Sequence, residues 1–189
     1  MYLEQNLIWA QRAIAHVQAA VPLGASNLGR DAYASEAQYQ RIGACVDSVR
    51  GTGLSVDEIA SLSDAANCGN CGEQSAVAFV FLRDRGVRPL DRVGRKLIDH
   101  AFVVIGRANS SALDDVSTWG PAAVICDPWA LQSYGTMEMA VMPAREAPQR
   151  WKNKMGVRIL EGRPTWFTVG STGNLAWVPI GFNPVNRVN

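Results

Sequence analysis

The chain has 189 residues, of which 48% are hydrophobic and 19% are charged, so it can bury the core of one globular domain. Its formal net charge is +1, and the Lys and Arg residues are scattered among acidic ones, which argues against a nucleic-acid partner. The apolar runs fall far short of the roughly 20 residues that a membrane span needs, and the N-terminus lacks a Sec-type signal peptide. We therefore expect a soluble protein.

The first half of the chain carries helical patterns. Apolar residues at helical spacing predict an amphipathic helix over residues 3 to 20. A second helix is expected to begin after Asp31 and to run to about Arg50, where glycines follow. Ser55 and Glu58 have the spacing of a capping box, which predicts a short helix directly after Ser55.

A buried helix is predicted next, because residues 75 to 82 are almost wholly apolar, and a helix that is apolar on all sides is buried. Asn70 can cap this helix, Glu73 lies in its first turn where a carboxylate suits the helix dipole, and Gly86 ends it. This prediction places Cys71 at the start of the helix.

The second half is expected to consist mainly of strands, because β-branched residues and turn signals replace helical spacing. His100 begins one apolar strand, and Asp127 directly follows another over residues 122 to 126. The stretch between them, 107 to 121, has turn composition and predicts an exposed connection. A short helix is expected after Trp129. Further strands are predicted over residues 157 to 160, 166 to 169 and 175 to 180.

Together these patterns predict a single α+β domain over residues 1 to 189. Its helical part is expected over about residues 1 to 86 and its mainly strand part over about 87 to 189. No internal repeat, low-complexity tract or linker interrupts the sequence.

Cys71 has the predicted setting of a nucleophile. A thiol reacts as a thiolate, and a helix N-terminus favours the thiolate through unpaired N–H groups and the positive end of the dipole. A base is then needed, and imidazole suits that task near neutral pH. Of the two histidines, His16 falls on the surface of the first helix, whereas His100 begins a strand that can face the buried helix. Asp127, after the next apolar strand, can hold the second ring nitrogen of His100.

The residues around this trio resemble the papain-like superfamily. The runs CGNCGEQSAVAF, DHAFVVIGR and CDPW, over about residues 65 to 130, have its order of Cys, His and Asp or Asn. The resemblance implies that Cys71 is the nucleophile, Cys68 an upstream structural cysteine and His100 the base. The same runs look even more like the transglutaminase-like branch. That branch includes arylamine N-acetyltransferases and bacterial papain-fold toxin and effector domains, some of them glutamine deamidases.

The sequence differs from the papain-type motif at several positions, and these differences favour some members of the superfamily over others. Papain-type proteases have Gln six residues before the nucleophile, where this chain has Ala65, and no Trp follows the cysteine. Asn67 and the Cys71 N–H are then the expected oxyanion donors. Asp127 in place of Asn favours the transglutaminase and deamidase side. The sequence offers no basis for a coenzyme A site.

The resemblance therefore implies an α+β, papain-like or transglutaminase-like fold in which a buried nucleophile helix packs on an antiparallel sheet. It implies a thiol hydrolase or transferase with a Cys71, His100 and Asp127 triad that deamidates or transamidates a protein glutamine without cofactor or metal. As a bacterial effector or toxin, it would act on a protein of a host or rival cell. An activating or chaperone partner and export from the bacterial cytoplasm without a Sec-type signal peptide are also implied. A cysteine protease of the same fold uses the same groups and is an alternative.

Two other classes of protein stay open. Cys68 and Cys71 form a CxxC pair that Cys45 and Cys126 can complete as the zinc site of a structural module. A catalytically inactive domain of the same fold would instead bind partners only. Because four cysteines are too few for a disulfide scaffold, we expect reduced thiols, with Cys68 small and buried near the site.

The remaining prominent residues have simpler interpretations. Glu73 is interpreted as a helix-start acid, and Trp119 and Trp129 as core or site-wall aromatics. Arg107 and residues 90 to 96 are expected to form a solvated face.

Overall fold

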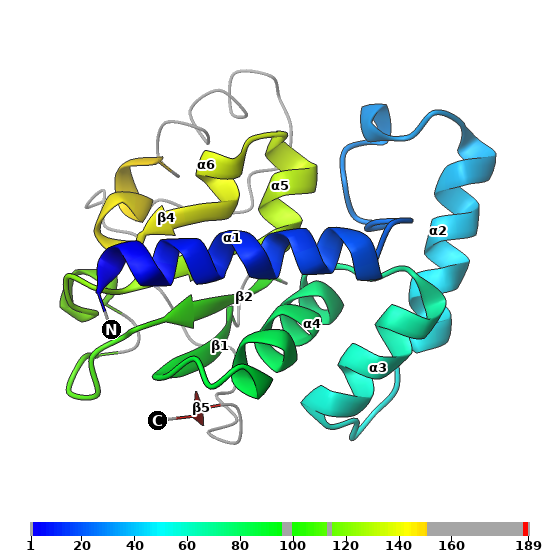
Figure 1. Ribbon diagram of the computed structural model, residues 1–189. Helices are drawn as coiled ribbons and strands as arrows, with labels where there is room; N and C mark the ends of the chain where they lie inside the picture. Colours follow the sequence, from blue (N-terminus) through cyan, green and yellow to red (C-terminus); the bar gives the residue numbers. More distant parts are fainter. Residues whose placement is uncertain (1, 96–99, 113–114, 151–186, 189) are drawn as a thin grey trace.

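The computed structural model describes residues 2–95, 100–112, 115–150 and 187–188, and Figure 1 shows their arrangement. In this part of the chain four α-helices precede the first strand: α1 (Leu3–Ala20), α2 (Glu36–Val49), α3 (Val56–Ala66) and α4 (Cys71–Asp84). The predicted helices are confirmed, since α1 covers residues 3 to 20 and α4 begins at Cys71. None of the described helices has the length and apolar character that crossing a membrane requires.

Capping chemistry sets the ends of these helices. At the start of α3 the Ser55 side chain accepts from the Glu58 N–H, and the Glu58 carboxylate accepts from the Ser55 N–H at 2.8 Å, which confirms the capping box. Helix α2 begins later than expected, because Ser35 caps it by accepting from the Gln38 N–H at 3.1 Å. After α4, Gly86 has a φ of 73°, in the left-handed region that favours glycine.

The described strands form a five-stranded antiparallel sheet in the order β4-β3-β2-β1-β5. They are β1 (Leu90–Arg95), β2 (His100–Ile105), β3 (Val124–Cys126), β4 (Val141–Pro143) and β5 (Arg187–Val188). The short helices α5 (Pro128–Tyr134) and α6 (Met137–Ala140) lie between β3 and β4. The strands beginning at His100 and ending at Cys126 are confirmed, and the architecture is mixed α+β. The strands predicted over residues 157 to 160, 166 to 169 and 175 to 180 lie outside the described residues.

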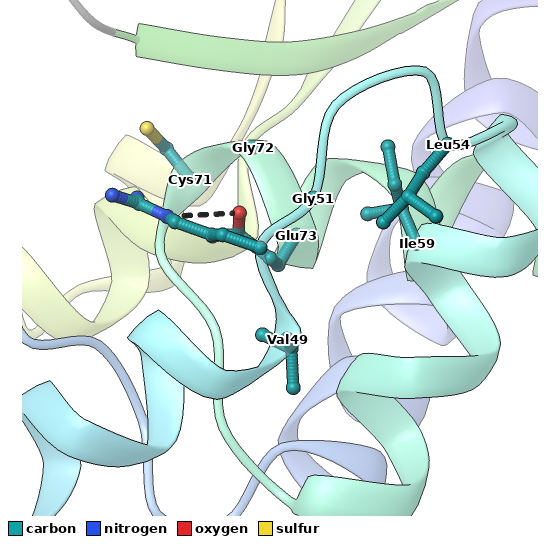
Figure 2. Close-up of a pocket in the computed structure, with 8 residues that line it drawn as sticks. Val49, Gly51, Leu54, Ile59, Cys71, Gly72 and Glu73 are labelled. Carbon is teal, nitrogen blue, oxygen red and sulfur yellow. Dashed lines mark hydrogen bonds and ion pairs between the residues drawn. The ribbon is translucent and has the colours of Figure 1, made fainter.

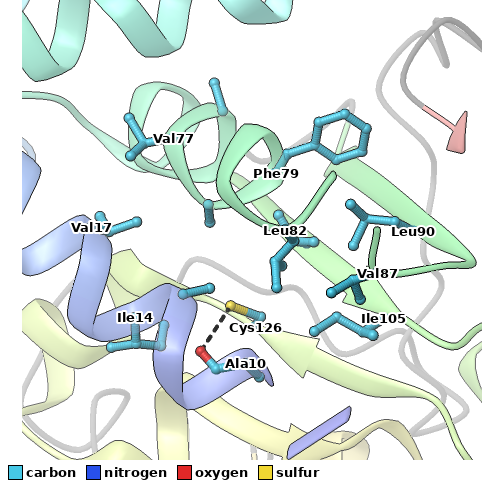
Figure 3. Close-up of a cluster of buried hydrophobic side chains, with 14 of the residues drawn as sticks. Ala10, Ile14, Val17, Val77, Phe79, Leu82, Val87, Leu90, Ile105 and Cys126 are labelled. Atoms are coloured by element: carbon cyan, nitrogen blue, oxygen red, sulfur yellow. Dashed lines mark hydrogen bonds between the residues drawn. The ribbon is translucent and has the colours of Figure 1, made fainter. Parts of the chain in front are cut away.

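Apolar side chains cover both faces of the sheet. Alternation along β2 sends Val103 and Ile105 to one cluster and Phe102 and Val104 to another. The first cluster joins the sheet to α1 and α4 and is shown in Figure 3. The second contains the fully buried Trp119, which is therefore a core aromatic as expected. Because α4 is held in the first cluster, its N-terminal end has a fixed position against the sheet.

A disulfide bond corrects the prediction about the cysteines. Cys45 in α2 is bonded to Cys68 in the turn before α4, with the two Cα atoms 6.2 Å apart. The expectation of reduced thiols is wrong for this pair, and Cys71 and Cys126 are the free cysteines. The spacing of cysteines along the chain does not reveal that α2 packs against this turn around Ile42. The bond closes a loop with a sequence separation of 23.

Arg107 also differs from its expected place on a solvated face. Its side chain is 5% exposed, and Asp91 has no exposed side-chain surface. Arg107 Nε donates to Asp91 Oδ2 at 2.9 Å and Nη2 donates to Asp91 Oδ1 at 3.1 Å, while Nη1 donates to Ser111 Oγ at 2.7 Å. The prediction was wrong because composition alone does not show that a charge has a buried partner. The stretch 107 to 121 likewise has a buried side, which contains Trp119.

Candidate active site

Cys71 is the first residue of α4 and is 3% exposed. The Asn70 N–H donates to Glu73 Oε2 at 2.8 Å and closes a capping box, which confirms Glu73 as a helix-start acid. Gly69 makes this turn feasible, because a Cβ there would lie 2.5 Å from the Cβ of Glu73. The thiol is thus attached where the first N–H groups of the helix have no intrahelical partner.

The turn before α4 is held by buried amide groups. Gln74 Nε2 donates to the Gly69 carbonyl at 2.8 Å and to Gln132 Oε1 at 3.1 Å. The same oxygen of Gln132 accepts from the Ala25 N–H at 3.1 Å. These bonds join α4, α5 and the segment after α1. They fix the position of Cys71 relative to the sheet, which is what a nucleophile requires.

His100 and Asp127 meet at one end of the sheet because β2 and β3 are antiparallel. His100 begins β2 and Asp127 directly follows β3, so the two positions lie at the same end of these neighbouring strands. His100 Nε2 lies 2.7 Å from Asp127 Oδ2, and both side chains are buried. The other carboxylate oxygen caps α5 by accepting from the Ala130 N–H at 3.1 Å. One carboxylate therefore both starts a helix and holds the imidazole.

Cys71 contacts the same imidazole and hydrogen-bonds to it. Because Nε2 faces Asp127, Nδ1 is the ring nitrogen left for the sulfur. Burial alone would lower the pKa of His100, but the charge and hydrogen bond of Asp127, with a further contribution from Cys71, raise it to about 10. The ring is therefore an imidazolium at neutral pH, and its positive charge lies beside the sulfur. The three residues expected to form the site are brought together.

Trp129 and His16 have the positions that the sequence predicts. Trp129 forms a wall of the site, since its ring lies 5.1 Å from that of His100 in an edge-on arrangement. Its Nε1 donates to Asn27 Oδ1 at 2.7 Å, which fixes the indole. His16 is exposed on α1 and stacks on Phe81 with ring centroids 4.4 Å apart, so it takes no part in the trio.

Asn67, the expected oxyanion donor, has a different position. It is the left-handed C-cap of α3 with a φ of 64°, and its side chain is exposed. Its Nδ2 donates to the Ala65 carbonyl at 3.4 Å, and its own carbonyl accepts from the Leu23 N–H at 2.9 Å. The structure does not direct the Asn67 amide to the thiol. The donors placed beside Cys71 are the N–H groups of the first turn of α4.

Arg92 is a site residue that the sequence analysis did not single out. Its Nε donates to Ser75 Oγ at 2.9 Å and its Nη2 donates to the Gly72 carbonyl at 2.8 Å, so the guanidinium lies against the first turn of α4. Strand alternation is the signal that points to it, because Arg92 shares a face of β1 with Leu90, which is buried against α4.

The geometry also bears on the zinc interpretation. Cys45 and Cys68 are bonded to each other, and the Cys126 thiol donates to the Ala10 carbonyl at 3.6 Å inside the core (Figure 3). Burial, with the nearby charge of Asp127, raises the pKa of Cys126. In the part of the chain that the structure describes, no group of three or more His, Cys, Asp or Glu side chains is placed to hold a metal ion. The four-cysteine site does not form.

No family model matches the chain, and no curated protein or solved structure matches it either. The interpretation of the site therefore rests on its own chemistry. A buried thiol at a helix N-terminus, an imidazole and a carboxylate on the far side of that imidazole are the groups of nucleophilic acyl transfer.

The Asp127→Asn variant is expected to lower the pKa of His100 well below its wild-type value of about 10, because burial is then opposed by Cys71 without the carboxylate. Asn retains an oxygen that can cap α5, so the fold should persist. NMR titration of the two imidazole C–H signals measures the change, with His16 as the internal reference. An unaltered His100 midpoint would contradict the pairing.

The same pair predicts a pH dependence of stability. Because the folded-state pKa of His100 is raised, its contribution is fully present below about pH 6.5 and is lost as the pH rises through about 10. The free energy of unfolding of the wild type, measured with urea, should therefore fall as the pH rises from about 6.5 to about 10. Asp127→Asn should show a flatter profile over the same range.

Proposed function

We propose that the chain is a cysteine-dependent acyl-transfer enzyme that acts on a carboxamide. Cys71 is the nucleophile, His100 the proton carrier and Asp127 the residue that orients the imidazole. The observation that carries the proposal is the 2.7 Å contact between His100 Nε2 and Asp127 Oδ2, with Cys71 hydrogen-bonded to the same ring. The burial of all three side chains supports the proposal, because catalysis requires reacting groups that are held in position.

The reaction begins when the Cys71 sulfur forms a bond to the amide carbon. The carbonyl electrons move to oxygen, and N–H groups of the first turn of α4 stabilise the oxyanion. The carbon–nitrogen bond then breaks as the His100 imidazolium gives its proton to the departing nitrogen, which leaves a thioester. Water attacks the thioester after losing a proton to His100, and the sulfur departs to leave a carboxylate. An amine in place of water completes transamidation instead.

A protein glutamine is the substrate that we propose. The resemblance of residues 65 to 130 to the transglutaminase-like branch supports this choice, as does an Asp in the third position. Packing of the buried α4 against an antiparallel sheet agrees with a papain-like or transglutaminase-like fold. By the same resemblance, the chain acts as a bacterial effector or toxin on a protein of a host or rival cell.

Mass spectrometry of protein extracts incubated with the wild type or with Cys71→Ala tests the proposal. Deamidation adds about one mass unit to a glutamine, transamidation produces a crosslink, and proteolysis produces new termini. We expect the first or second change with the wild type and neither with Cys71→Ala, whose fold is checked by circular dichroism. New termini alone would assign the cysteine protease activity, and equal modification by both proteins would reject Cys71 as the nucleophile.

A further inference from the structure

A pocket of about 320 Å³ adjoins the nucleophile. Figure 2 shows Cys71, Gly72 and Glu73 at one end of this pocket and Leu54 and Ile59 at the other. The pocket therefore extends from Cys71 to an apolar surface of α3 and of the loop before it. A substrate whose carbonyl carbon is held at Cys71 would extend its neighbouring atoms into this space.

Two guanidinium groups, those of Arg50 and Arg92, lie near the Cys71 end of the pocket. The Glu73 carboxylate faces the Arg50 guanidinium, with Arg50 Nε 3.4 Å from Glu73 Oε1. Its negative charge also acts on Arg92, which is held at the first turn of α4. The Cys71 sulfur acts on Arg92 as well, so Arg92 is the more enclosed of the two cations and Arg50 is the one that lines the pocket.

Arg50 is the cation of the two that remains available to a ligand. Its side chain is 46% exposed, and the contact with Glu73 is the only hydrogen bond or ion pair of this side chain among the described residues. The contact uses Nε, so both terminal nitrogens keep their donors. Arg92, in contrast, donates to Ser75 and to the Gly72 carbonyl. A guanidinium edge with two free N–H groups matches the geometry of a carboxylate.

We propose that this pocket binds a carboxylate that the substrate carries next to the attacked carbonyl, with Arg50 as its partner. Leu54 and Ile59 would contact the aliphatic part of the same substrate residue. The inference rests on the proposed function, because it assigns a substrate class to that site: a glutamine with an acidic neighbour. The repulsion between Glu73 and the substrate carboxylate is limited, because the Glu73 carboxylate accepts from the Asn70 N–H and is paired with Arg50.

Alkylation of Cys71 by a charged and a neutral reagent tests the pocket without a known substrate. Iodoacetate carries a carboxylate next to its reacting carbon, and iodoacetamide is its neutral analogue. Arg50→Gln is expected to lower the ratio of the iodoacetate rate to the iodoacetamide rate by about fivefold, because only iodoacetate loses an attraction. Arg41→Gln is the matched control: Arg41 is exposed in α2, and its replacement changes the net charge equally. Its ratio should stay within about twofold of the wild type.

The outcomes separate this inference from the proposed function. An unchanged ratio in Arg50→Gln, with Cys71 still labelled by both reagents, would overturn the pocket assignment and leave the acyl-transfer proposal intact. If neither reagent labels Cys71 faster than it labels a thiol in an unfolded peptide, both the pocket assignment and the acyl-transfer proposal are overturned.

Peptides then identify the source of the carboxylate. Matched peptides carry one glutamine next to Glu, next to Met, or next to a free C-terminal carboxylate. The Glu peptide is expected to be deamidated with about tenfold higher kcat/KM than the Met peptide, and Arg50→Gln should reduce that preference. A higher kcat/KM for the peptide with the terminal carboxylate than for the Glu peptide would overturn the acidic neighbour and assign the pocket to chain ends. Equal rates for all three peptides would reject recognition of a carboxylate.

Discussion

Replacement of His100 by Gln is expected to lower the rate of Cys71 acylation by about 10³-fold, because proton transfer by a positioned imidazole contributes roughly 10² to 10⁴. The buried ring holds its Nε2 against Asp127 and presents Nδ1 to the sulfur, and glutamine carries no positive charge at either position. The acylation burst with an activated ester such as p-nitrophenyl acetate measures this rate without knowledge of the natural substrate.

His16→Gln is the matched control, because the chain has two histidines and His16 lies exposed on α1. Its burst should equal that of the wild type within about twofold, as is usual for a substitution away from the reacting groups. A His100→Gln variant that stays folded and keeps a wild-type burst would remove this residue from the mechanism.

Replacement of Arg107 by Met is expected to lower the free energy of unfolding by about 3 to 5 kcal/mol. The change removes the guanidinium that pairs with Asp91 through two hydrogen bonds, and it leaves a fully buried carboxylate without its cation. Urea denaturation followed by circular dichroism measures the loss. The effect is expected to be on stability, since the Arg107 side chain bonds to Asp91 and Ser111.

A double variant, Asp91→Leu with Arg107→Met, distinguishes the loss of a partner from the loss of packing. Removing both charges is expected to restore most of the stability, because the cost of the single change comes from a buried carboxylate that has lost its ion pair with Arg107. Arg41→Met, at an exposed position, should alter stability by less than about 0.5 kcal/mol. A loss below about 1 kcal/mol in Arg107→Met would show that the buried pair has little energetic weight.

The trio could be predicted because local sequence marks each of its members. A polar turn followed by an apolar run indicates that Cys71 begins a buried helix. His100 and Asp127 stand at the ends of strand-like runs, and antiparallel pairing then brings them to one edge of the sheet. The capping boxes at Ser55 and Asn70 were predictable for the same reason, since their partners are three residues away.

The features that were missed depend on contacts between distant segments. The partners Asp91 and Arg107 are 16 residues apart, and the charge pattern gives no sign that both are buried. The oxyanion assignment to Asn67 came from a sequence offset, but the left-handed backbone there ends α3 and turns the side chain to Ala65. Arg50 reaches the site because α2 ends beside α4, which no periodicity along one helix can show.

The bond between Cys45 and Cys68 makes the molecule sensitive to the oxidising power of its surroundings. Glutathione and thioredoxin reduce such bonds in the cytosol, whereas secreted proteins keep them. Reduction would leave the segment leading to Cys71 held by noncovalent contacts alone, at a cost of about 3 kcal/mol for a loop of this length. One polypeptide would thus have two covalent forms, and the compartment it occupies would select how firmly Cys71 is anchored.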